Sequence, residues 1–305
     1  MIDLPLMAHL LEALRDDAGI ILLGDRDQLA SVEAGAVLAD ICADSINNHN
    51  GVAVTHLTKS YRFGEDSGIG ALSRLINAGD GTAALDMLVS GSHDDLVWRP
   101  LPDGRSFEKN FITAVREGYD DYVRTTTPED ALAGLDSFRV LTPLRSGLYG
   151  AENLNKLSLA ALGLGHMADE PYYRLMPILV AGNSYDLGLF NGDTGVVMDC
   201  NGRPAVWFGS QEGGLRHLSP LRLPAHETAF ALTVHKSQGS EFDNLLLILP
   251  DRMSDVLGRE LLYTAVTRAR RRVEIWGTED VFRQAVERRT RRSSGLRDRL
   301  AGRIQ

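Results

Sequence analysis

Residues 228–243 read TAFALTVHKSQGSEFD. The stretch opens with apolar residues that are typical of a buried strand, and a dense polar segment runs from His235 to Glu241. Ordinary turns after strands are built from Gly, Pro, Asn and Asp, so this segment carries more hydrogen-bonding side chains than a turn needs. We expect a strand over AFALTV that delivers polar groups to a charged ligand.

Apolar runs elsewhere in the chain repeat this pattern and indicate an α/β fold. Further strands are predicted over residues 19–25, 51–57, 138–145, 244–250 and 272–277. Helices are predicted from the Asp3–Pro5 start to residue 14, over 34–46, through much of the acidic region 64–136, and over 259–270. Unbroken apolar strands that alternate with helices are typical of a parallel sheet covered on both faces.

Residues 172–224 differ in character from their surroundings. Short β-type segments such as PILVA, TGVVMD and AVWFG are separated by Pro, Gly and Asn, and Asn191-Gly192 suits a tight hairpin turn. Closely spaced strands of this kind predict a small β barrel inserted between the α/β elements.

Composition and charge narrow the class of protein. The 305 residues are 44% hydrophobic, contain no apolar run long enough to span a membrane, and carry two distant cysteines, which favours a globular protein of a reducing cytoplasm. The net charge of −9 is unevenly distributed. Residues 64–136 contain 14 acidic and 6 basic residues, whereas residues 252–305 contain 14 arginines and 7 acidic residues. The basic end is either a disordered tail from about residue 283 or a surface for a separate partner.

Polar side chains follow three of the predicted strands. Asp25, Asp27 and Gln28 follow the first; Lys59, Tyr61 and Arg62 follow the second; the segment from His235 to Glu241 follows the strand quoted above. Ligands of open parallel sheets bind at the carboxyl ends of strands, so we expect one shared site there. In the helix over 259–270, Tyr263 and Thr267 share a face and Arg268 lies beside them. Each feature alone also fits a turn, a salt bridge or a surface arginine.

As an ordered set, GDRDQLASVEAG (24–35), LTKSYRF (57–63), LTVHKSQGSEF (232–242) and LLYTAVTRAR (261–270) resemble the third to sixth motifs of superfamily-one DNA helicases. The resemblance is closest to the RecD branch, the alpha subunit of exodeoxyribonuclease V. It includes LTPLRSGLYGAENLN (141–155) and LGLFNGDTGVV (187–197), and it covers the chain from near Met1 to about Gly277.

The resemblance implies two RecA-like motor domains, of which this chain holds the second and a remnant of the first. No Gly-Lys-Ser or Gly-Lys-Thr occurs, so the phosphate-binding loop is absent, and Ala168-Asp169-Glu170 is a poor acidic magnesium motif. We expect a C-terminal portion of a longer motor, a truncated gene or a misplaced start codon. The implied boundaries are the remnant over 1–48, the second domain over 49–171 and 225–280, an SH3-like barrel over 172–224, and a basic tail over 281–305.

By the same resemblance, the catalytic residues are Gln28, Arg62 and Arg268. The two arginines would contact the γ-phosphate of ATP from the second domain, and Gln28 would sense the γ-phosphate or its attacking water from the first. The ATP-binding set is completed by Gly24, Asp25, Gly239 and Glu241. Asp25 would act through water bound to Mg²⁺, whose ligands are expected mainly from a missing N-terminal part; no metal-binding cluster is predicted within this chain.

Residues implied in DNA binding are Thr142, Arg145, Thr233, His235, Lys236 and Ser237. Thr233, His235 and Ser237 offer small donors that can bind phosphates of a single strand without reading its sequence, and Thr142 and Arg145 could hold the strand in the same groove. Tyr149 and Phe190 are candidates for stacking on bases, although both also fit a role in the core.

The function implied is a subunit of a 5′-to-3′ ATP-dependent DNA helicase in double-strand-break repair and recombination, with RecB-like and RecC-like partners. The polarity follows from the resemblance alone. Two alternatives stay open, namely a fragment inert towards ATP that clamps DNA or docks to other subunits through its acidic region, and a free-standing RecD-like helicase. A nuclease is disfavoured, because the chain has no clustered carboxylates with a lysine.

Overall fold

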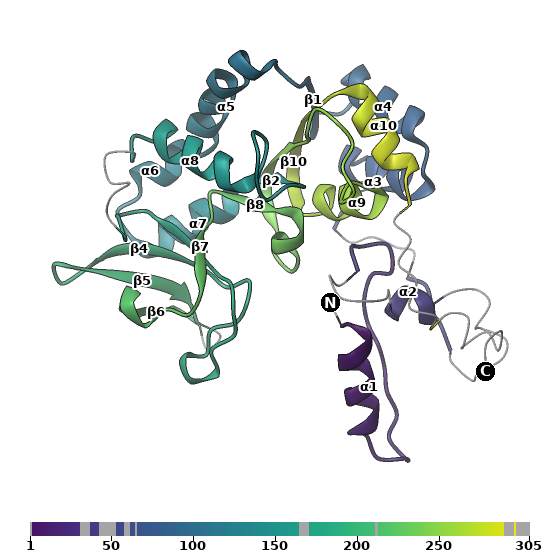
Figure 1. Cartoon of the computed structure of the whole chain (residues 1–305), viewed down its shortest axis with the longest axis horizontal. Coiled ribbons are helices and arrows are strands. Elements are labelled where there is room, and N and C mark those ends of the chain that lie inside the picture. The colour runs from purple at the N-terminus through teal and green to yellow at the C-terminus, as the bar shows by residue number, and fades with distance from the viewer. Residues whose placement is uncertain are drawn as a thin grey trace.

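A five-stranded parallel sheet forms the centre of the protein (Figure 1). The computed structural model describes residues 2–30, 37–42, 53–57, 62–64, 66–164, 171–210, 213–289 and 296. The order of strands is β1 (Leu96–Pro100), β10 (Ala269–Gly277), β9 (Phe242–Ile248), β2 (Phe138–Thr142) and β8 (Ala231–Thr233), and every neighbouring pair is parallel. The prediction of an α/β fold with a parallel sheet is confirmed.

Helices cover both faces of this sheet, and alternate residues of β9 pack on opposite sides. Leu245 and Leu247 pack with α3 (Gly68–Ala78), α4 (Gly81–Ser90), α9 (Arg259–Val266) and α10 (Glu279–Glu287). Leu246 and Ile248 pack with the cluster that includes α5 (Gly104–Gly118), α6 (Asp120–Arg124), α7 (Pro128–Ser137) and α8 (Ala151–Ala161). A strand that is apolar on both faces therefore sits in the middle of the sheet, as its sequence requires.

The first two helices of the chain lie apart from the sheet (Figure 1). Helix α1 (Leu4–Glu12) begins as predicted, with the Asp3 carboxylate accepting from the Leu6 amide at 2.8 Å, and α2 covers Val37–Ile41 within the helix predicted over 34–46. The strands predicted over 19–25 and 51–57 are wrong for the residues that the structure describes. Those residues pair with no neighbouring strand, and Ile21 and Leu23 are 87% and 88% exposed.

A second sheet is antiparallel and follows the order β6 (Leu215–Leu218), β5 (Arg203–Gly209), β4 (Thr194–Cys200), β3 (Pro177–Val180) and β7 (His226–Thr228). Its own small core contains Val180, Val197 and Val206. Gly192 in the predicted turn has φ +100°, a conformation that favours glycine. The β-rich insert is thus present, and its last strand lies beyond residue 224. Short 3₁₀ turns are η2 (Tyr185–Leu187), η3 (Pro220–Arg222) and η4 (Val234–Ser237).

Helix α10 lies partly within the range expected to be a basic tail. The side chains of Val281, Phe282, Ala285 and Val286 are buried, and the helix packs on α4 and α9. Residues 281–287 are therefore part of the folded domain rather than of a tail. Among the residues that the structure describes, no helix has the length and apolar character needed to cross a membrane.

Candidate functional site

The predicted site residues divide between two ends of the parallel sheet. Thr142 and Thr233 pair at the carboxyl ends of β2 and β8. Glu241 and Arg268 instead immediately precede β9 and β10, at the amino ends of those strands, where Phe242 pairs with Ala269. The expectation of one shared site at the carboxyl ends is wrong, because residues 234–241 return from the end of β8 to the start of β9.

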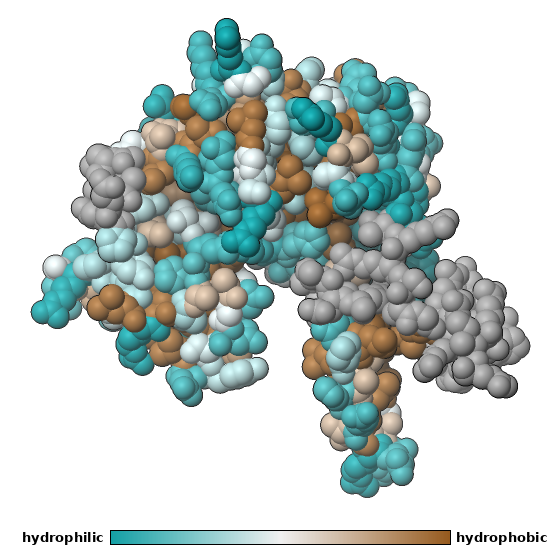
Figure 2. All heavy atoms as spheres, in the orientation of Figure 1, coloured by the Kyte–Doolittle hydropathy of each residue, from teal (hydrophilic) through white to brown (hydrophobic). Residues whose placement is uncertain are grey.

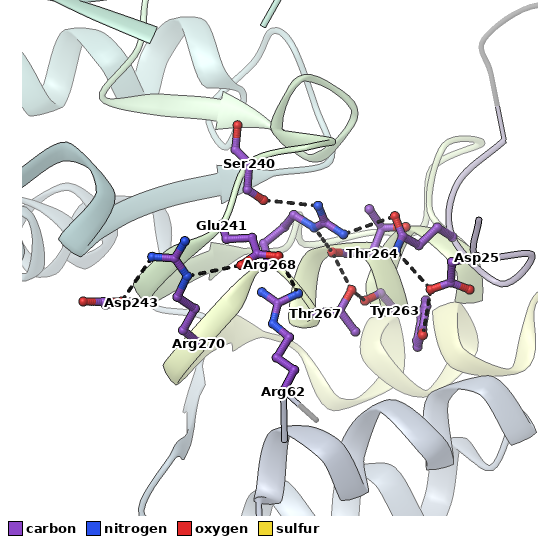
Figure 3. A network of polar contacts seen from close by, with 11 residues as sticks. Asp25, Arg62, Ser240, Glu241, Asp243, Tyr263, Thr264, Thr267, Arg268 and Arg270 are labelled. Atoms are coloured by element: carbon purple, nitrogen blue, oxygen red, sulfur yellow. Dashed lines mark hydrogen bonds and ion pairs between the residues drawn. The ribbon is translucent and has the colours of Figure 1, made fainter. Parts of the chain in front are cut away.

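Arg268 lies at the centre of the amino-end cluster (Figure 3). Its side chain is buried, with the residue 5% exposed. Nη2 donates to Gln28 Oε1 at 3.1 Å, Nη1 donates to the carbonyl of Ser240 at 3.2 Å, and Nε donates to the carbonyl of Thr264 at 3.2 Å. The guanidinium thus joins a residue near the N-terminus to two elements more than 200 positions away.

Gln28 and Asp25 continue this network, and Figure 3 labels Asp25 beside Tyr263. Gln28 Nε2 donates to Asp25 Oδ2 at 3.0 Å, and the hydroxyl of Tyr263 donates to the same oxygen at 3.0 Å. Asp25 Oδ1 accepts from the amide of Asp27 at 3.0 Å. The structure therefore brings together Asp25, Gln28 and Arg268, as the motifs predicted, and adds Tyr263.

The backbone of Leu29 ties the same loop to the sheet domain. Its amide donates to Thr264 Oγ1 at 2.9 Å, and its carbonyl accepts from Gln238 Nε2 at 3.0 Å. The Leu29 side chain is buried in the core cluster of α3 and α9. The loop 24–29 is consequently held by hydrogen bonds and by apolar burial together.

Arg62 reaches the cluster through Glu241. Its guanidinium pairs with one oxygen of Glu241 at 3.1 Å, while Arg270 pairs with the other at 3.2 Å and with Asp243 at 3.7 Å (Figure 3). Glu241 therefore separates two cations and partly neutralises both. Arg62, Arg268 and Arg270 concentrate positive charge beside a single carboxylate.

Burial sets the electrostatics of these groups. Desolvation lowers the pKa of Arg268, the neighbouring Arg62 lowers it further, and Glu241 and Asp25 oppose the change. Desolvation also lowers the pKa of Arg62, with Glu241 opposing. Both guanidinium groups stay charged at neutral pH, because arginine starts from a very high pKa. A partly desolvated pair of cations is suited to a polyanionic ligand such as a phosphate chain.

Gly24 and Gly239 lie beside a hollow of about 570 Å³, whose polar lining includes Asp25, Gln28 and Gln238. A side chain at position 24 would come within 2.6 Å of the Leu38 methyl group, and Gly239 has φ +85°. These two glycines thus serve a close approach and a left-handed turn. The hollow and the arginine cluster share Gln28.

Two of the residues predicted to bind DNA are fully buried. The prediction that their hydroxyls contact DNA directly is therefore wrong. The hydroxyl of Thr142 donates to the carbonyl of Tyr149 at 2.6 Å and accepts from the amide of Leu144 at 3.2 Å. The hydroxyl of Ser237 donates to the carbonyl of Val234 at 2.8 Å. Both side chains shape turns after strands instead.

The other candidates at this end remain accessible. Arg145 pairs with Glu152 at 3.0 Å on the surface, Lys236 pairs with Glu227, and Thr233 and His235 are half-buried. Tyr149 is buried edge-on against Phe107, which matches its core alternative. Phe190 is partly exposed and packs edge-on against Tyr185.

The sequence patterns did not identify four residues of the site, namely Ser240, Asp243, Thr264 and Arg270. They placed Tyr263 on the same helix face as Thr267 but gave it no role. Glu241 and Asp243 flank the first residue of β9, as Arg268 and Arg270 flank the first residue of β10, and this spacing was a usable signal for ion pairs between the two strands. Lys59, Tyr61 and residues 168–170 lie outside the described part of the chain. Within that part, no group of three His, Cys, Asp or Glu residues could hold a metal ion.

Comparisons with known proteins agree with the motifs. The family model of the UvrD-like helicase C-terminal domain matches residues 228–275, and that of an AAA domain matches residues 1–93. RecBCD enzyme subunit RecD of Mycobacterium tuberculosis is 42% identical over 98% of this chain and 52% of its own length. The ATP-dependent RecD2 DNA helicase of Deinococcus radiodurans is 29% identical over 97% of this chain and 38% of its own length.

The crystal structure of Pif1 helicase from Bacteroides in complex with ADP-AlF3 and ssDNA aligns with 78% of this chain and with 54% of the Pif1 chain. The identity is 16% and the TM-score is 0.39, a likeness too weak to transfer the roles of residues. The chain spans about half the length of the curated RecD relatives that it matches. The resemblance found in the motifs is confirmed: curated homologues over nearly all of this chain are named RecBCD enzyme subunit RecD or RecD2 helicase, and the model of the UvrD-like helicase C-terminal domain matches the segment that holds Arg268.

Proposed function

We propose that this chain forms part of an ATP-dependent 5′-to-3′ DNA helicase subunit that acts in double-strand-break repair and recombination. The direct hydrogen bond between Arg268 and Gln28 carries this proposal, because it places a cation and an amide from two separate motifs at one point. In phosphoryl transfer, such a cation stabilises the charge that develops on the γ-phosphate oxygens.

The proposed division of labour follows the contacts. Residues 1–48 belong to the first RecA-like domain and supply Gln28, while residues 49–171 and 229–287 form the second and supply Arg62 and Arg268. ATP between them favours closure to the extent that it binds the closed state better than the open state. Hydrolysis removes those contacts, and alternating closure then moves the protein along single-stranded DNA.

Magnesium fits this scheme as a partner of the ATP phosphates. Asp25 accepts hydrogen bonds from Gln28, Tyr263 and the Asp27 amide, and the role proposed for it is a contact to Mg²⁺ through a bound water. The main ligands would come from a segment that carries a phosphate-binding loop. Loss of Mg²⁺ would leave the phosphate charge to the arginines alone.

The proposed DNA path lies at the carboxyl ends of β2 and β8. Arg145, Thr233, His235 and Lys236 are the accessible polar residues there. Thr142 and Ser237 would support the path by fixing the turns that present these neighbours. The antiparallel sheet over 177–228 would form an SH3-like barrel beside it. Cytoplasmic RecB-like and RecC-like subunits are the proposed partners.

Arg268→Ala tests the proposal in an assembly that hydrolyses ATP. We expect DNA-stimulated phosphate release to fall by about a thousandfold or more, with binding of a fluorescent single strand changed little. Arg283→Ala is the matched control, because this arginine pairs with Asp280 on the surface of α10. Equal turnover in the Arg268 variant and the unaltered protein would reject the assignment.

A second candidate is a docking fragment that is inert towards ATP. Its support is a groove of about 730 Å³ that Glu117 and Asp121 of the acidic region line together with residues of β1 and β10. Charge reversal at Glu117 and Asp121 would then release a partner subunit without changing ATP turnover. A free-standing RecD2-like helicase would need no such partner and would unwind DNA alone.

A further inference from the structure

The hydroxyl of Tyr263 has a defined direction in its hydrogen bonds. It donates to Asp25 Oδ2 at 3.0 Å, and an ionised carboxylate can only accept. The ring itself packs against the core cluster of α3 and α9. Burial, followed by the nearby Asp25, raises the pKa of Tyr263 well above its ordinary value, so the proton stays on the oxygen at neutral pH.

Asp25 is consequently fixed at both of its oxygens. Oδ1 accepts from the Asp27 amide, and Oδ2 accepts from Tyr263 and from Gln28 Nε2. A carboxylate held by three donors cannot rotate without breaking at least one bond. It therefore presents a constant acceptor to Gln28.

A side-chain amide has two chemically different ends, and this constant acceptor decides which end faces where. Nε2 only donates and Oε1 only accepts, while an ionised carboxylate only accepts. Gln28 must then direct Nε2 towards Asp25 and Oε1 towards Arg268, as the distances of 3.0 and 3.1 Å show. A rotated amide would place its donor against a guanidinium and its acceptor against a carboxylate, and both contacts would be repulsive.

We propose that Tyr263 is a positioning residue for ATP hydrolysis, which it supports through Asp25 by fixing the Gln28 amide with its oxygen towards the nucleotide. This inference rests on the proposed function. When Arg268 turns to the γ-phosphate, Oε1 loses that donor and becomes the acceptor that orients the attacking water. Tyr263, on α9, thereby links the helix that precedes Arg268 to the loop that carries Gln28.

Tyr263→Phe is the first test, because it removes the hydroxyl and keeps the ring. We expect kcat for ATP to fall about tenfold, which is the size of one hydrogen bond to a charged group, while KM for ATP changes less than about twofold. Tyr122→Phe is the matched control: its hydroxyl donates to the carbonyl of Leu175 at 2.7 Å in the opposite core cluster. That variant should lower the midpoint of thermal unfolding and leave kcat unchanged.

A double-mutant cycle separates positioning from general loosening of the fold. If Tyr263 acts through Gln28, the Tyr263→Phe change should cause no further loss of kcat in a Gln28→Ala protein. An equal loss in both backgrounds would overturn the proposal, as would an unchanged kcat in the single variant.

Failure of this inference is distinguishable from failure of the proposed function. Should Arg268→Ala abolish turnover while Tyr263→Phe matches the unaltered protein, only the role of Tyr263 is refuted. Should Arg268→Ala leave turnover intact, the ATP site itself is misplaced, and the role of Tyr263 is refuted with it.

Discussion

Glu241 is shared by two guanidinium groups, and its negative charge offsets part of the positive charge of the cluster. Replacing it by glutamine removes one negative charge while keeping an oxygen acceptor. We expect Glu241→Gln to tighten binding of a fluorescent ATP analogue about threefold at low salt, because the screened attraction for phosphate increases. The free energy of unfolding should change by less than about 1 kcal/mol, since both ion pairs are partly exposed.

A titration in about 0.5 M salt provides the internal check, because screening should remove most of the gain there. Asp280→Asn changes the net charge by the same amount on the surface of α10 and serves as the control. Weaker binding by the Glu241 variant would instead indicate that its carboxylate contacts the nucleotide directly.

Arg139 is a fully buried cation whose role is structural. Its guanidinium donates to the carbonyls of Ala229 and Leu135 and lies 4.9 Å from the centre of the Phe242 ring. Arg139→Met keeps much of the volume but leaves both carbonyls without their donor. We expect a loss of about 2–4 kcal/mol in the free energy of unfolding, measured by denaturant titration. Arg283→Met on the surface should change it by less than about 0.5 kcal/mol.

Among the elements, helix α3 depends on a carboxylate from a distant loop. Asp95, just before β1, accepts from the amides of Gly68 and Ile69 at 3.1 Å and from the Ser67 hydroxyl at 3.0 Å. These amides are the ones that a helix leaves unpaired at its start. Asp95→Ala should therefore destabilise the protein by about 1–2 kcal/mol in thermal or denaturant unfolding. Asp94→Ala removes the exposed neighbouring carboxylate and should have almost no effect.

The strands illustrate what sequence patterns can and cannot provide. Runs such as 244–250 predicted a central strand correctly, because Leu245 to Ile248 are apolar on both faces. Residues 19–25 carry the same signal. An apolar pattern, however, indicates only that a strand must be packed between other elements, and no element within the described residues packs over this segment. Strand β1 was missed because it contains Arg99 and ends in Pro100, and a proline within a strand is confined to positions such as the edge of a sheet, where β1 lies.

The candidate site was accessible to sequence reasoning only through its motifs. Gln28 and Arg268 are 240 positions apart, and no local periodicity brings them together. Assigning polar residues to the strands before them was also misleading for Glu241, which belongs to the start of the next strand. The networks through Tyr263 and Thr264 depend on how α9 packs, and spacing alone does not determine that packing.

On the scale of the whole molecule, the N-terminal part exposes a broad apolar surface (Figure 2). Its exposed apolar residues are Ile2, Leu6, Leu10, Leu11, Ile20, Ile21 and Leu23. Contiguous apolar patches of this kind promote association in water. We expect the isolated 305-residue chain to self-associate with rising concentration in analytical ultracentrifugation. Ile21→Asn with Leu23→Asn should reduce that association, and unchanged association would place the contact elsewhere.

The isolated chain should also release no phosphate from ATP. Its described residues supply cations and an amide to the proposed site, and its sequence contains no phosphate-binding loop to hold the triphosphate. A malachite-green assay with and without single-stranded DNA measures this directly. DNA-stimulated release by highly purified chain, abolished by Arg268→Ala, would show that residues of this chain alone complete the site.

The return of residues 233–241 across the sheet has a mechanical consequence. Thr233 ends β8 at the carboxyl end of that strand, and Glu241 precedes β9 at the amino end of its strand. The segment between them therefore runs from one end of the parallel strands to the other. A stretch of that length reaches at most about 30 Å when fully extended, and the 3₁₀ turn η4 within it shortens it further, so the two ends are joined by a short covalent path. Displacement of the cationic end on loss of a phosphate would therefore pull directly on the end nearest the proposed polynucleotide track, through covalent bonds and without a relay of side chains.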